Sequence, residues 1–144
     1  MQTLPGEIPM KTLKVDAKVN NLSKVLDFIN DELSEAGCSI RDAMQIDVAV
    51  EELFVNIALY AYPSGSGIAT ICISILNDPK TAEIILSDSG IPFDPLAKED
   101  PDISLNADER EIGGLGIYMA RKTMDEITYE NSDGLNITTI RKKI

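Results

Sequence analysis

Residues 49–62 read AVEELFVNIALYAY, which is apolar on almost every face of a helix. The polar exceptions are Glu51, Glu52 and Asn56. A helix with so few polar positions is buried along most of its length, so this stretch predicts a helix in the middle of a domain. Its polar exceptions become candidates for chemistry, because an unpaired carboxylate in apolar surroundings costs free energy.

A strand and a second helix are predicted before this stretch. Ser39 and Asp42 form a capping-box-like start for the buried helix, which we expect to run to about Ala61. Apolar residues at spacings of three and four predict another helix over 21–36, and the glycine that follows is placed to stop it. Loose alternation over 8–15 predicts an edge strand. Its expected apolar anchors are Ile8, Met10, Leu13 and Val15.

Two pairs of strands and one helix are predicted after it. Segments 68–76 and 81–86 flank the turn sequence NDPK and predict a hairpin. The polar stretch 87–114 is too long for an ordinary connection and predicts a functional loop or a mobile lid. Helical spacing resumes over 115–124, and residues 127–144 predict two strands around an SDG turn. This order predicts an α+β fold, a two-layer α/β sandwich with a mostly antiparallel sheet and helices on one face.

Composition excludes several classes of protein. The 144 residues fit a single domain, and they carry 13 Lys plus Arg against 24 Asp plus Glu, a formal net charge of −11. This balance argues against the basic surface that nucleic acids or anionic lipids require. The chain has no histidine, so proton transfer would fall to carboxylates, Lys, Tyr or Cys. Cys38 and Cys72 lack CxxC spacing and are expected to be reduced, in a cytoplasmic protein without a targeting or membrane-spanning segment.

The first candidate for chemistry is the pair Glu52 and Asn56. Four residues apart, they share one face of the predicted helix, whereas Glu51 points about a third of a turn away. The amide oxygen of Asn56 can hold a hard cation while Glu52 orients or deprotonates a nucleophile. The alternative is that Glu52 lies at a helix edge and Asn56 bonds to backbone.

The second candidate is DSGIPF, residues 88–93, directly after an apolar strand. Asp88 can accept a hydrogen bond from the exocyclic amine of adenine, where guanine would present a carbonyl. Gly90, without a Cβ, would allow a ring to approach the backbone. The alternative is a surface turn, since these residue types are common turn formers.

The third candidate is GGLG, residues 113–116, at the predicted start of a helix. Glycines there leave backbone amides uncovered, and the positive end of the helix dipole adds to them, so the segment can hold phosphate oxygens. The alternative is a hinge followed by a helix start. The spacing is neither a Rossmann fingerprint nor a P-loop. In this order, the three motifs supply a metal ligand, a base and phosphate contacts to one nucleotide-sized site.

The segments EELFVNIALYAYP (51–63), DSGIPFDP (88–95) and GGLGIYMARKTMD (113–125) resemble the N box and the two glycine boxes of the Bergerat-fold (GHKL) ATPases. The likeness is greatest to the stand-alone anti-sigma-factor serine kinases of bacteria and runs from about residue 8 to the C-terminus. It implies a sandwich that binds ATP and magnesium beneath a flexible lid at about 94–112. It also implies transfer of the γ-phosphoryl group to a serine of an antagonist protein, with a sigma factor as a possible regulatory partner.

The resemblance implies a role for each site residue. Glu52 would be the general base, Asn56 the magnesium ligand and Asp88 the adenine contact. Gly90 would lie under the adenine ring. The phosphates would meet Gly114, Leu115 and Gly116.

One position departs from the family pattern. Tyr60 stands where many relatives carry His or Lys. Whether Thr138, Thr139 or neither contacts a phosphate stays open. Relatives often form homodimers, which we carry over as an expectation.

Other functions stay open on the sequence alone. They are an ATP-dependent switch that binds a partner without phosphotransfer, a detached catalytic module of a histidine kinase, and a structural domain without a nucleotide. Ordering of the segment 94–112 by nucleotide would serve the switch. The acidic surface favours partner proteins that carry Lys or Arg.

Overall fold

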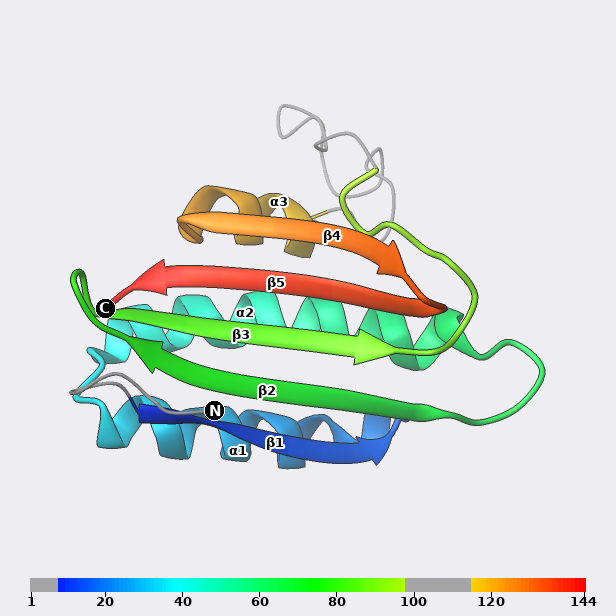
Figure 1. Ribbon diagram of the computed structural model, residues 1–144, viewed down its shortest axis with the longest axis horizontal. Helices are drawn as coiled ribbons and strands as arrows, with labels where there is room; N and C mark the ends of the chain where they lie inside the picture. Colours follow the sequence, from blue (N-terminus) through cyan, green and yellow to red (C-terminus); the bar gives the residue numbers. More distant parts are fainter. Residues whose placement is uncertain (1–7, 98–114) are drawn as a thin grey trace.

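The computed structural model describes residues 8–97 and 115–144. In this part of the chain, one antiparallel sheet has the strand order β1-β2-β3-β5-β4, and the helices lie together on one of its faces (Figure 1). The strands are β1 (Ile8–Asp16), β2 (Ile68–Leu76), β3 (Thr81–Asp88), β4 (Glu126–Ser132) and β5 (Leu135–Lys143). The helices are η1 (Val19–Asn21), α1 (Leu22–Glu35), α2 (Ile40–Asn56), η2 (Ile57–Ala61) and α3 (Leu115–Thr123). The predicted α+β two-layer sandwich is therefore confirmed.

The core lies between α2 and the sheet. Residues of β2 and β3 alternate between buried and half-buried positions, as expected for strands with one covered face. Phe54 of α2 is fully buried, and burying a side chain of this size contributes about 1.5–3 kcal/mol. Packing of α2 against the sheet therefore fixes where its polar side chains lie relative to the ends of the strands.

The ends of α1 and α2 follow from local signals. Gly37 has φ +78°, and the Cys38 N–H bonds to the Leu33 carbonyl at 2.9 Å, which closes the last turn of α1. The Ser39 hydroxyl accepts a hydrogen bond of 3.1 Å from the Asp42 N–H, so the predicted helix cap is confirmed. Continuation of the buried helix to Ala61 is also confirmed, as α2 followed by the π-helical turn η2.

The first strand differs from the prediction at one position. Met10 is 59% exposed, so it is wrong as an apolar anchor, while Val15 is buried. The register between β1 and β2 shifts between Ile8 and Lys11. Such an irregularity changes which side of the sheet a residue faces, which explains the out-of-step spacing in the sequence.

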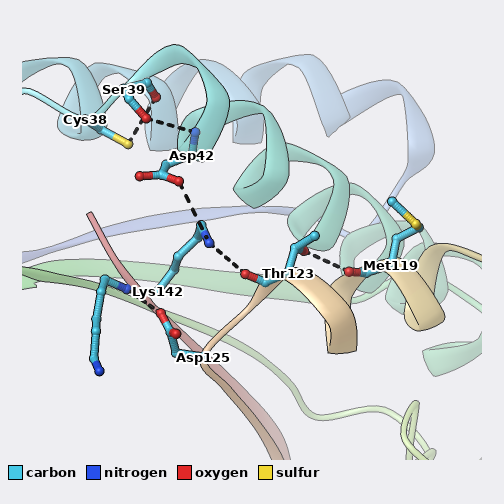
Figure 2. Close-up of polar contacts among 8 residues, drawn as sticks. Cys38, Ser39, Asp42, Met119, Thr123, Asp125 and Lys142 are labelled. Carbon is cyan, nitrogen blue, oxygen red and sulfur yellow. Dashed lines mark hydrogen bonds and ion pairs between the residues drawn. The ribbon is translucent and has the colours of Figure 1, made fainter.

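Lys142 of β5 joins the start of α2 to the end of α3 (Figure 2). Its Nζ donates a 2.7 Å hydrogen bond to the Thr123 carbonyl and lies 3.9 Å from Asp42 Oδ1. A carbonyl at a helix C-terminus has no partner within its own helix, so this lysine satisfies it and brings a positive charge to the negative end of the dipole.

None of the helices in the described ranges is long and apolar enough to cross a membrane.

Candidate functional site

A pocket of about 340 Å³, including its open mouth, lies between the helical elements α2 and η2, the end of β3, the middle of β4 and the first half of β5. Two predicted site residues, Asn56 and Asp88, line it together. Its other lining residues are Leu53, Ile57, Ala61, Ile91, Phe93, Pro95, Tyr129, Asn136 and Thr138.

Asp88 is the last residue of β3 and is buried. Its Oδ1 accepts two hydrogen bonds, from the Gly90 N–H at 2.8 Å and from Asn136 Nδ2 at 2.9 Å. Within the described residues, no hydrogen bond reaches Asp88 Oδ2. In that same part of the chain, every fully buried side-chain oxygen or nitrogen has a partner, so Oδ2 is not fully buried. Asp88 lines the pocket. The carboxylate is therefore able to accept a hydrogen bond from a ligand.

Asn56 is the last residue of α2 and contributes a side-chain amide to the pocket wall. Nothing in the described part of the chain hydrogen-bonds to this amide, so the alternative in which Asn56 bonds to backbone does not hold there. An amide oxygen in this state is a suitable ligand for a hard cation such as Mg²⁺. Among the described residues, no group of three or more acidic, Cys or His side chains is arranged so that it could hold a metal ion.

Glu52 lies one helical turn before Asn56 and contacts the start of α3. A Cβ added at Gly116 would stand 2.3 Å from Glu52 Oε2, so the carboxylate occupies the place of a Gly116 side chain. Glu52 is half-buried and does not line the pocket, whereas Glu51 is exposed. The first and third motifs are therefore in contact, beside the pocket that the first and second motifs share.

Gly90 makes a close approach, but to protein. A Cβ at Gly90 would stand 2.2 Å from the Ala61 carbonyl oxygen, and the Ile91 N–H donates to the same oxygen at 2.9 Å. In the structure, a glycine is needed at position 90 because the DSG turn packs directly against the end of η2. This requirement differs from the predicted one, which was space for an adenine ring. A contact of Gly90 with adenine stays a prediction.

The turn η2 also positions Tyr60. Its ring stacks on Phe93, with the centroids 5.5 Å apart and an interplanar angle of 29°. Phe93 lines the pocket, so Tyr60 supports one of the pocket walls from outside. Single π-helical turns of this kind occur frequently at functional sites.

Part of the predicted lid is packed against the pocket. Pro95 is buried in the pocket wall, and the Arg121 guanidinium of α3 donates a hydrogen bond to the Leu96 carbonyl. Leu115 begins α3 and is 45% exposed. Gly114 and residues 98–112 lie outside the described residues. The contact of Gly114 with phosphate and the lid over 94–112 therefore stay predictions.

Asn136 and Tyr129 belong to this site although the sequence did not single them out. Asn136 and Tyr129 line the pocket from β5 and β4. Thr138 lines the pocket and is buried, whereas Thr139 pairs with Ile85 in the alternate set of positions. The two-residue alternation of side chains along β5 is the only signal in the sequence that places Asn136 and Thr138 on the same face of the sheet. It does not indicate whether that face meets the helices.

Comparison with known proteins agrees with this geometry. The family model described as histidine kinase-like ATPase domain matches residues 15–142. The chain is 28% identical over 135 residues to the serine-protein kinase RsbW of Staphylococcus epidermidis, covering 90% of this chain and 84% of that protein. It is 30% identical over 132 residues to the serine-protein kinase RsbW of Staphylococcus aureus strain MSSA476, covering 88% and 82%.

Two solved structures share the fold. The RsbU and RsbW domains of a Mycobacterium tuberculosis protein superimpose with a TM-score of 0.67 at 17% identity, covering 94% of this chain and 32% of that one. The histidine kinase domain of a blue-light activated histidine kinase from Erythrobacter litoralis EL346 gives a TM-score of 0.57 at 14% identity, covering 87% and 60%. This chain thus spans about a third of the first solved chain and 60% of the second.

Proposed function

The chain belongs to the histidine kinase-like ATPase domain family and is related to the serine-protein kinases RsbW, and from this premise we propose that it is an ATP-dependent protein serine kinase of the anti-sigma-factor type. Its acceptor would be a serine of an antagonist protein, and a sigma factor would be its regulatory partner. The observation that carries the proposal is the convergence of the three motifs. Asn56 and Asp88 share one pocket, and Glu52, one turn from Asn56, contacts Gly116.

The residues fit ATP and Mg²⁺. Asp88 Oδ2 is an available acceptor for the adenine amine, and the Asn56 amide is an available metal ligand. When bound, ATP supplies the γ-phosphoryl group and Mg²⁺ neutralises phosphate charge. The amides around Gly114, Leu115 and Gly116 would orient the phosphates at the start of α3. Glu52 would accept the proton of the seryl hydroxyl.

The partners follow from charge and from relatives. A surface with a net charge of −11 favours partners that present Lys or Arg. We also propose that the protein forms a homodimer. We also propose the whole chain, residues 1–144, as one ATPase domain whose lid covers about 94–112.

Thermal unfolding with nucleotides tests the binding half of the proposal. We expect ATP and ADP with Mg²⁺ to raise the melting temperature and GTP to have little effect, because a ligand of the native state stabilises it. Asp88→Asn should abolish the preference for adenine over guanine nucleotides and weaken, without abolishing, the shift by ADP, and Asn56→Ala should abolish the part of the ATP shift that depends on Mg²⁺. An equal shift with GTP, or no shift with ATP, would contradict a site for adenine nucleotides.

Labelled ATP and the antagonist protein test the transfer half. Glu52→Gln keeps the size of the side chain but removes its basicity, so we expect transfer about 10²–10⁴-fold slower with nucleotide affinity unchanged. Glu51→Gln, one residue away and exposed, is the matched control and should transfer at the wild-type rate. Equal rates for Glu52→Gln and wild type would remove the base role.

A switch without phosphotransfer is the second candidate, and one contact favours it. Arg121 of α3 bonds to the Leu96 carbonyl, and Leu96 follows Pro95 of the pocket wall. A ligand that moved this wall would therefore also move α3. Stable nucleotide-dependent partner binding with no phosphoserine in the partner would select this function over the kinase.

A further inference from the structure

The side-chain amide of Asn136 has its whole hydrogen-bonding capacity used by protein. Its Oδ1 accepts from the Tyr129 hydroxyl and from Asn131 Nδ2 at 3.1 Å. Its Nδ2 donates to Asp88 Oδ1 at 2.9 Å and to the Ile91 carbonyl at 2.9 Å, with the Gly90 carbonyl at 3.4 Å. An asparagine side chain offers two donors and accepts two hydrogen bonds, so no capacity is left for a ligand.

These partners fix which way the amide faces. The Ile91 carbonyl is only an acceptor, so the atom that faces it must be the NH₂ group. The same NH₂ group faces Asp88, on the neighbouring strand in direct register with Asn136. Asn136 is 5% exposed, and a flipped amide would leave buried acceptors facing each other at a cost of about 1–3 kcal/mol each. Asn136 is therefore held in one orientation.

This arrangement holds the carboxylate of Asp88 in one orientation. Its Oδ1 meets two N–H donors, from Asn136 and Gly90, and both require an acceptor. With Oδ1 occupied, Oδ2 is the oxygen that remains for the pocket. Because Oδ1 is held by these two donors in a buried setting, the ionised carboxylate presents Oδ2 to a ligand as a hydrogen-bond acceptor.

We propose that Asn136 is a positioning residue for nucleotide selectivity, which acts through Asp88 and is itself held by Tyr129. A ligand that offers an N–H at this point, such as the exocyclic amine of adenine, is accepted. A ligand that offers a carbonyl oxygen there, such as guanine, meets a second acceptor and is rejected. This inference rests on the proposed function, since it concerns the same pocket.

The variant Asn136→Asp tests the proposal through the pH dependence of ADP binding. It replaces the NH₂ group by an oxygen that faces Asp88 Oδ1 and the Ile91 carbonyl. Two adjacent carboxyl groups share one proton at low pH, and that proton would reproduce the wild-type hydrogen bond to Asp88. At high pH both groups are charged and repel each other, which displaces Asp88. Asp88 and Tyr129 are the titratable groups among the described residues that line the pocket.

We expect the ratio of variant to wild-type dissociation constants for ADP to rise at least tenfold between pH 5.5 and pH 8.5. Taking the ratio at each pH removes the titration of ADP itself. Asn77→Asp makes the same chemical change at an exposed turn residue beyond the far end of β3, and its ratio should stay near one. A pH-independent ratio for Asn136→Asp would overturn the proposal. Failure of wild type to bind ADP would instead contradict the proposed function.

Tyr129→Phe provides a second test if Asn136→Asp does not fold. Loss of the hydroxyl removes one of the two donors that hold Asn136 Oδ1. We expect ADP affinity to fall about 3- to 10-fold in the wild-type background, since a hydrogen bond contributes about 0.5–1.5 kcal/mol. In the Asp88→Asn background the same change should have no further effect. An equal loss in both backgrounds would show that Tyr129 acts on the ligand directly and would overturn the proposal.

Discussion

The carboxylate of Glu52 fills the space that a side chain at Gly116 would need. A Cβ on Gly116 would stand 2.3 Å from Glu52 Oε2 and 2.5 Å from its Cδ. This contact joins the middle of α2 to the first turn of α3. It is the point where the proposed base meets the segment that is predicted to hold phosphate.

Gly116→Ala should therefore destabilise the protein by about 1–3 kcal/mol, because an added methyl group overpacks this contact. In a helix without such a neighbour, the same substitution would stabilise by about 0.5–1 kcal/mol. Urea unfolding measures the difference. Gly65→Ala, with nothing within 4 Å of the added Cβ, is the control and should stay near the wild-type free energy of unfolding. A stabilised Gly116→Ala protein would show that Glu52 moves away without cost.

Tyr60→Ala should weaken ADP binding about 2- to 10-fold, because the stack on Phe93 is lost and such pairs contribute about 0.5–1.5 kcal/mol. Tyr60→Phe keeps the ring and should bind ADP as wild type does. Calorimetric titration with ADP measures both variants. If Tyr60→Phe were as weak as Tyr60→Ala, the hydroxyl and not the stack would be the supporting group.

Lys142→Met should lower the free energy of unfolding by about 1–3 kcal/mol, because the Thr123 carbonyl at the end of α3 loses its charged donor. The side chain of Lys142 is 12% exposed, so water replaces this hydrogen bond poorly. Lys143→Met changes the next residue, whose side chain is exposed, and should stay within about 0.5 kcal/mol of wild type. Equal effects for the two variants in urea unfolding would contradict a specific role for Lys142.

Asp47→Asn should stabilise the protein at neutral pH but not at pH 3. Burial raises the pKa of Asp47 above its ordinary 3.8, although a hydrogen bond from Asn30 opposes this shift. The native state then holds this proton more tightly than the unfolded state does, so stability falls as pH rises through the window above 3.8. An Asn at position 47 keeps an acceptor for Asn30 and carries no charge.

Urea unfolding of wild type and Asp47→Asn across pH 3–7 checks this sign. The difference should be absent at the acid end and grow as pH rises. Asp31→Asn removes the same charge from an exposed position of α1 and controls for net charge. A difference that was largest at pH 3 would contradict the assignment to burial.

Local sequence signals determined the elements and the main polar residues of the site. Helical spacing placed α1, α2 and α3, and the NDPK and SDG turns placed both hairpins. These signals work because capping, turn conformation and amphipathic periodicity depend on residues that are near in the chain. The same stretches contained Glu52 and Asn56, which stood out as polar residues in an apolar helix, and Asp88, which stood out at the end of an apolar strand.

Only the tertiary structure decided how the site is completed. Asn136 meets Asp88 across two paired strands whose residues lie 48 positions apart in the chain, and strand register is fixed by packing against α2. The presence of Thr138, and not Thr139, in the pocket wall, the exposure of Met10 and the docking of Gly90 onto Ala61 depend on the same alignment. A sequence states which side chains are available, whereas long-range packing settles which of them share a face.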